Sequence, residues 1–173
     1  QHMNNRFDQV DQDHQEIIGI LRGQSSSVGR LIFGSRPDVA TGERLVERRE
    51  QQQLNSLIAD PTQRRTVLVG MRGCGKTQLA SLLAQQCEDA QWRLVAWLNA
   101  GSRQSLVADL VELAKQLKID TRDQPTQEQL IVRCLNYLRS SEASDRLIVF
   151  DNVENIGDLR RLIPSGEALR VVA

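Results

Sequence analysis

The sequence predicts an α/β protein in which helices cover both faces of a parallel sheet. Short apolar runs alternate with segments of helical periodicity, and the longest apolar stretches have the length of strands. Aromatic residues make up only 3% of the 173 residues, so the core must be built mainly from leucine, valine, isoleucine and alanine. That composition suits buried parallel strands and their covering helices.

The first forty residues differ from the rest and are expected to form a separate N-terminal arm. Gln1–Met3 resembles a cloning remnant and is set aside. The apolar spacing over Asn5–Arg22 predicts an amphipathic helix, which Gly23–Ser27 ends. Residues 4–40 are therefore assigned to a helical arm or linker, and residues 41–173 to the main domain. The arm could lead from an upstream domain or pack as a helix on the core.

Strands and helices alternate through the main domain. The expected elements, in order, are a helix over Glu43–Leu57, a strand over Thr66–Val69, a helix over Thr77–Gln86, a strand over Trp92–Leu98, helices after Ser102 and Thr126, a strand over Leu147–Phe150, a short helix carrying Leu159 and Leu162, and a strand from Leu169. Ser102 is placed to cap its helix, and Thr126 with Gln129 forms a capping-box pair.

One glycine-rich segment, VLVGMRGCGKTQLA, links the first predicted strand of this domain to the helix after it. Gly70, Gly75, Lys76 and Thr77 complete the pattern G-x-x-x-x-G-K-T, the Walker A phosphate loop. Its backbone N–H groups must converge on phosphate oxygens, and Gly73 and Gly75 supply the backbone freedom for this. The alternative is an ordinary glycine-rich turn, but the strand and helix on either side favour the phosphate loop.

The side chains of this loop have distinct expected roles. Lys76 should reach the β- and γ-phosphates, and the hydroxyl of Thr77 should bind Mg²⁺. Gln78, in the first turn of the helix, is assigned to the same nucleotide-binding set. Cys74 is included as a small loop residue whose side chain points away from the ligand, with redox sensing as an alternative role.

A second carboxylate for the magnesium ion is expected at the end of a buried strand. Four apolar residues run directly into Asp151, at the strand end where ligands bind in open α/β sheets. The alternative role for Asp151 is to cap a helix. Asn152 follows it and can orient water but cannot accept a proton. Glu154, two residues further on, could substitute as the base. The alternative is that hydrolysis is slow and the domain mainly holds nucleotide, which we favour because the amide of Asn152 cannot accept the proton.

The order of elements also predicts the order of strands. The strand from Leu169 follows Asp151, so it should insert between the phosphate-loop strand and the strand that ends at Asp151. This additional central strand belongs to the ATPase branch and disfavours simple kinases and small GTPases. The sequence contains no Asn-Lys-x-Asp guanine signature, which favours adenine.

From Leu45 to Ala173 the sequence resembles the NB-ARC nucleotide-binding domain of the STAND class of signalling ATPases. The resemblance lies in LVERREQQQLNSL, the phosphate loop, RLVAWLNAGSRQSLVADL, DRLIVFDNVENIGDLRRLIPSG and EALRVVA. It implies that Val46 and Arg48 lie near adenine or ribose, although Glu47 stands where the family pattern has glycine. It also implies that Asn99 and Ser102 face the γ-phosphate.

The same resemblance implies a switch in which ADP holds a resting state and ATP permits oligomerisation. It further implies partner domains that follow the chain, namely helical, winged-helix and sensor domains, so that this fold is expected to be incomplete at its C-terminus. Arg160 and Arg161 could reach a neighbour's phosphate in an oligomer, although such a pair is usually a solvated helix face. The alternatives are an AAA-type ATPase acting on nucleic acid and an interaction fragment with a vestigial site.

Composition bounds the partners and the compartment. The formal net charge is zero, so no basic field favours nucleic acid. No apolar run reaches transmembrane length, and no secretory signal is evident. The three cysteines lack the paired spacing of a metal site or a disulfide framework, which predicts reduced thiols in a cytoplasmic protein.

Overall fold

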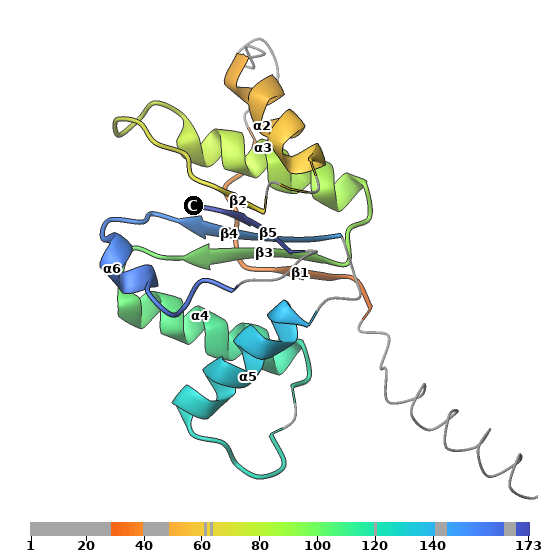
Figure 1. Cartoon of the computed structure of the whole chain (residues 1–173), viewed down its shortest axis with the longest axis vertical. Helices are drawn as coiled ribbons and strands as arrows, with labels where there is room; N and C mark the ends of the chain where they lie inside the picture. The colour runs from red at the N-terminus through yellow and green to blue at the C-terminus, as the bar shows by residue number, and fades with distance from the viewer. Residues whose placement is uncertain are drawn as a thin grey trace, which may run out of the picture.

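Five parallel strands form one sheet in the computed structural model (Figure 1). They are β1 (Leu31–Phe33), β2 (Arg65–Thr66), β3 (Leu94–Asn99), β4 (Arg146–Asp151) and β5 (Leu169–Val172). The structure describes residues 29–39, 49–60, 62, 64–119, 121–140, 145–164 and 169–173. The predicted arm helix over Asn5–Arg22, and also Val46 and Arg48, lie outside these residues.

The strand order is β1-β3-β4-β5-β2, and every neighbouring pair is parallel. β5 therefore lies between β4 and β2, as its position in the chain predicts. Beyond the last ladder pair, the N–H of Leu68 donates to the carbonyl of Ala173 at 2.7 Å. The α/β class and the additional central strand are confirmed.

Two groups of helices cover the two faces of the sheet (Figure 1). One face carries α2 (Arg49–Ala59) and α3 (Lys76–Asp89). The other carries α4 (Arg103–Gln116), α5 (Gln127–Arg139) and the short α6 (Ile156–Leu159). This arrangement is the three-layer architecture expected when strands and helices alternate.

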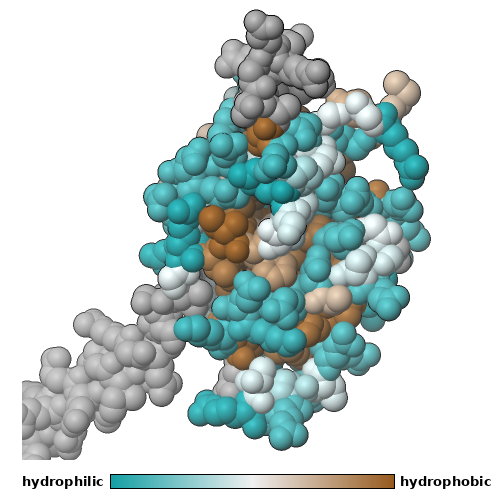
Figure 2. Space-filling view, turned by 180° about the vertical axis from the view of Figure 1, so that it is seen from behind, coloured by the Kyte–Doolittle hydropathy of each residue, from teal (hydrophilic) through white to brown (hydrophobic). Residues whose placement is uncertain are grey.

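The apolar core is split by the sheet into two clusters. Along β3, Ala96 and Leu98 pack on the side of α4 and α5, while Val95 and Trp97 pack on the side of α3. Because successive strand residues point to opposite faces, a strand buried on both sides must be continuously apolar. Figure 2 shows hydrophobic residues gathered across the middle of one face of the molecule, between polar surfaces above and below.

The helix ends follow the predicted chemistry. Ser102 caps α4, and Thr126 with Gln129 forms a reciprocal capping box on α5. At the other end of α5, the guanidinium of Arg146 donates to the carbonyls of Tyr137 and Ser140, at 3.4 and 3.1 Å. Burial lowers the pKa of Arg146. These bonds satisfy carbonyl groups that the helix itself leaves without partners.

The structure adds one strand that the sequence does not predict. Leu31–Phe33, within the segment assigned to the N-terminal arm, pairs with β3 at the edge of the sheet. Three residues are too few to show a strand periodicity, and Gly34 interrupts the run. Some boundaries also differ. The helix predicted to end at Leu57 ends at Ala59, while its predicted start lies outside the described residues, and the strand predicted over Thr66–Val69 has only two ladder residues.

None of the helices in the described ranges combines the length and the apolar character that crossing a membrane requires.

Gly34→Ala should destabilise the fold by at least about 2 kcal/mol, since a residue with a side chain is strained at positive φ. Gly34 has φ +84°, and a Cβ there would lie 2.1 Å from the carbonyl oxygen of Trp97 on β3. Gly29→Ala is the matched control, because nothing lies within 4 Å of its added Cβ. Urea unfolding measures the difference. Equal stability of the two variants would contradict the close approach of the turn after β1 to β3.

Candidate functional site

The loop between β2 and α3 has the backbone shape that an anion-binding loop needs. Gly73 and Gly75 both adopt positive φ, at 78° and 92°. Gly75 is also the N-cap of α3, where no side chain bonds to the first N–H groups. The first turn of α3 therefore presents backbone donors and the positive end of the helix dipole at this edge of the sheet.

The ammonium group of Lys76 lies within this loop. Its Nζ donates to the carbonyls of Gly70 and Met71, at 2.7 and 2.9 Å. These bonds tie the first turn of α3 to the start of the loop and hold a positive charge where the backbone donors converge. A phosphate arriving at the loop would therefore meet both the charge and the amide groups.

Cys74 lies on the lysine side of the loop. Its Sγ is 3.9 Å from the Nζ of Lys76, and a Cβ added at Gly70 would come within 2.7 Å of this sulfur. That this side chain points away from the ligand stays a prediction. The absence of a side chain at Gly70 is what leaves room for the thiol.

Thr77 and Asp151 meet at the carboxyl edge of the sheet. The hydroxyl of Thr77 donates to Oδ1 of Asp151 at 3.0 Å. The same carboxylate oxygen accepts the N–H of Asn152 at 2.9 Å. A hydroxyl and a carboxylate are hard oxygen ligands of the kind Mg²⁺ prefers, so these two side chains fit the ion.

The helix-capping alternative for Asp151 is not what the structure shows. The N-cap of α6 is Asn155, whose Oδ1 accepts the N–H of Gly157 at 2.8 Å. Asp151 instead faces the phosphate loop through Thr77.

A cavity of about 450 Å³ lies between the phosphate loop and the ends of β4 and β5. Its volume is within the range of small-molecule sites. The lining residues come from these three segments: Leu68, Arg72, Gly73, Lys76, Thr77, Ala80, Val149, Phe150, Asp151, Asn152, Val153, Glu154, Val172 and Ala173. The structure thus brings the predicted Lys76, Thr77, Asp151, Asn152 and Glu154 together around one cavity.

Arg72 is a lining residue that the sequence reasoning missed. Its guanidinium contacts the carboxylate of Glu154 at 3.2 Å, and both side chains are largely exposed. The contact joins the phosphate loop to the segment after β4. The signal in the sequence was an arginine at one of the variable positions of the Walker A pattern. Its partner Glu154 lies 82 residues further along the chain, so no local pattern links the two.

Other predicted residues lie outside this cavity. Asn99 sits opposite Asp151 in the ladder, but its Oδ1 accepts the N–H of Gly101 at 3.0 Å. Ser102 is used as the cap of α4. Arg160 and Arg161 are both exposed after the end of α6, which agrees with the solvated alternative.

The parallel sheet with its additional central strand, the glycine loop ahead of α3 and the carboxylate at the end of β4 define a P-loop NTPase fold. A family model described as an AAA domain matches residues 59–171. The chain therefore belongs to the AAA domain family, a class of nucleotide-binding P-loop ATPase domains. Neither the curated proteins nor the solved structures contain a match to the chain.

The three thiols should differ sharply in reactivity. Cys74 is exposed, whereas Cys87 and Cys134 are buried, and burial raises the pKa of each buried thiol to about 12. Because the thiolate is the nucleophile, iodoacetamide at pH 8 should label one cysteine in the native protein and three after denaturation. Intact-mass spectrometry counts the labels. Two or more labels on the native protein would contradict the burial of α3 or α5.

Proposed function

We propose that this chain is the nucleotide switch domain of a STAND-class signalling ATPase, binding ATP and ADP with Mg²⁺ and hydrolysing ATP slowly. The observation that carries the proposal is the contact between Thr77 and Asp151 beside the Lys76 ammonium. These groups come from segments far apart in the chain, and they supply the metal ligands and the positive charge that a triphosphate requires.

The chain's own groups would divide the work of binding. The loop amides and the first turn of α3 take the phosphate oxygens, and Lys76 exchanges its bonds to Gly70 and Met71 for the terminal phosphates. Thr77 and Asp151 hold Mg²⁺, which supplies charge neutralisation to the phosphates when it is bound. The loop's carbonyl contacts keep the lysine in place before the ligand arrives.

Slow hydrolysis follows from the residues after Asp151. Asn152 lines the cavity but carries an amide, which orients water without accepting its proton. Glu154 lines the same cavity and can accept a proton, but it lies two residues further on and contacts Arg72. We assign Glu154 the role of general base. To act, its carboxylate must first break its contact with Arg72.

A slow ATPase suits a switch better than a motor. The free energy available for switching is the difference in nucleotide affinity between two arrangements of the protein. A long-lived ATP state lets that difference drive assembly with further copies, and with the helical, winged-helix and sensor domains that the family resemblance implies.

The second candidate is an AAA-type ATPase that acts on nucleic acid, which the AAA domain match favours equally. The zero net charge and Asn152 favour the switch instead. ATP turnover with and without double-stranded and single-stranded DNA separates the two candidates. Stimulation of turnover by DNA would select the second.

Lys76→Ala should abolish the stabilisation of the protein by MgATP, because a ligand stabilises only the state that binds it. At a ligand concentration of 100 times Kd, the wild-type protein should gain about 2.7 kcal/mol, measured by thermal unfolding with and without MgATP. Lys115→Ala is the control, since that exposed ammonium at the end of α4 contacts Glu112, away from the site. An unchanged MgATP shift in Lys76→Ala would remove Lys76 from the site.

Glu154→Gln should slow ATP hydrolysis by at least about tenfold, since general base catalysis of this kind contributes at least that much. The affinity for MgATP should stay within about twofold, because the exposed contact with Arg72 contributes little. Single-turnover hydrolysis and equilibrium binding give the two quantities. Glu128→Gln, in the exposed first turn of α5, is the control. An unchanged rate in Glu154→Gln would exclude Glu154 as the base.

A further inference from the structure

Two segments that line the cavity are joined to each other by one ion pair. Arg72 belongs to the phosphate loop and Glu154 to the segment after β4, and both residues line the cavity. The Nη2 atom of Arg72 donates to Oε1 of Glu154 at 3.2 Å. The two side chains are 95% and 66% exposed, so the contact lies at the open side of the cavity, where a ligand enters.

Arg72 lies at the tip of a tight turn in the loop. The N–H of Cys74 donates to the carbonyl of Met71 at 3.3 Å, which places Arg72 and Gly73 at the centre of a four-residue turn. Gly73 has φ 78°, and a Cβ added there would meet nothing within 4 Å. The turn therefore fixes the backbone at Arg72, while the space around it lets the long side chain move from one partner to another.

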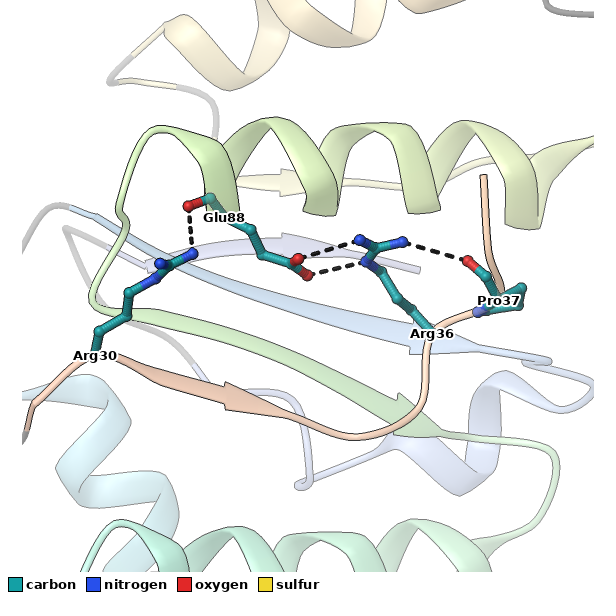
Figure 3. Close-up of polar contacts among 4 residues, drawn as sticks. All are labelled: Arg30, Arg36, Pro37 and Glu88. Atoms are coloured by element: carbon teal, nitrogen blue, oxygen red, sulfur yellow. Dashed lines mark hydrogen bonds and ion pairs between the residues drawn. The ribbon is translucent and has the colours of Figure 1, made fainter. Parts of the chain in front are cut away.

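A second arginine–glutamate pair in the molecule has the opposite character (Figure 3). The Nε and Nη2 atoms of Arg36 donate to the two carboxylate oxygens of Glu88, at 2.9 and 3.1 Å, and the two side chains are only 22% and 16% exposed. Paired donors on a partly buried carboxylate hold a fixed geometry. The contact between Arg72 and Glu154 uses one donor and is open to solvent, so it contributes little to stability and is easily exchanged.

The proposed role of Glu154 places this contact beside the terminal phosphate of the nucleotide. A general base must lie within reach of the water that attacks the phosphorus atom. The guanidinium of Arg72 contacts that base, so it lies in the same part of the cavity. A guanidinium presents its donors in a planar fork that matches phosphate oxygens, and a terminal phosphate carries more negative charge than one carboxylate. The phosphate is therefore the stronger partner for Arg72.

We propose that Arg72 is the residue by which this site distinguishes ATP from ADP, and that it does so by exchanging Glu154 for the terminal phosphate. That phosphate is the part of ATP that ADP lacks. The same exchange frees the carboxylate of Glu154 for the attacking water, so the base is released only when a triphosphate is bound. The inference rests on the proposed nucleotide function, and it gives a binding role to a position that the Walker A pattern leaves variable.

The test compares nucleotides with and without the terminal phosphate. Dissociation constants for MgADP and for the magnesium complex of the non-hydrolysable β,γ-imido analogue of ATP are measured by calorimetry on the wild-type protein and on Arg72→Ala. The expected result is roughly tenfold weaker binding of the ATP analogue, the loss of one charged contact, with MgADP binding within about twofold. A structural defect of the whole site would weaken both nucleotides alike.

The chain offers a matched control at the opposite edge of the sheet. Arg93, just before β3, forms a surface ion pair with Asp145, just before β4. Because both residues precede their strands, they lie at the edge away from the phosphate loop. Arg93→Ala should leave both dissociation constants unchanged. Arg72→Lys, which keeps the charge but loses the planar fork, should fall between the wild type and Arg72→Ala.

The outcomes separate the two proposals. Unchanged or tighter binding of the ATP analogue by Arg72→Ala overturns the assignment of Arg72, and so does equal weakening of both nucleotides, while the nucleotide function stands in either case. If the wild-type protein binds neither nucleotide, the proposed nucleotide function fails and the assignment of Arg72 fails with it. If Arg72→Ala does not fold, Arg72→Gln and Arg72→Lys decide the result by the same comparison.

Discussion

The hydrogen bond between Thr77 and Asp151 depends on the order of strands in the sheet. The two residues are 74 positions apart, and they meet because β2 and β4 flank the same central strand, β5. Parallel strands end at one edge, so the helix that follows β2 and the carboxylate that ends β4 must converge there. β5 thus sets the spacing between the phosphate loop, which follows β2, and the end of β4. Its last residues, Val172 and Ala173, also line the cavity between them.

The parts of the molecule that the sequence predicts are those governed by local or periodic rules. The capping box of Thr126 and Gln129, the apolar run into Asp151 and the glycine pattern of the loop each appear within a few residues. The place of β5 also follows, because chain order and right-handed crossovers leave few topologies open. These features were enough to predict β2 to β5 and the edge of the sheet at which the site lies.

What the sequence does not reveal depends on contacts between distant residues. β1 is only three residues long, and its pairing with β3 shows in no periodicity. Arg36 and Glu88 are 52 positions apart, and each resembles an ordinary surface charge in its own segment. Two charged residues predict an ion pair only when the fold has already placed them, so such contacts emerge from the topology rather than from a motif.

The helix α3 joins these two kinds of feature. Its first turn carries Lys76, Thr77 and Gln78, and its last turn carries Glu88, which pairs with Arg36 from the turn after β1. A hydrogen-bonded helix of this length transmits position along its axis with little bending, so groups fixed at its two ends keep a constant separation. The phosphate loop and the segment after β1 therefore both contact one helix, α3. The ion pair of Arg36 and Glu88 and the bond from Gln78 to Asp38 therefore attach one segment to both ends of the helix that carries the phosphate-binding residues.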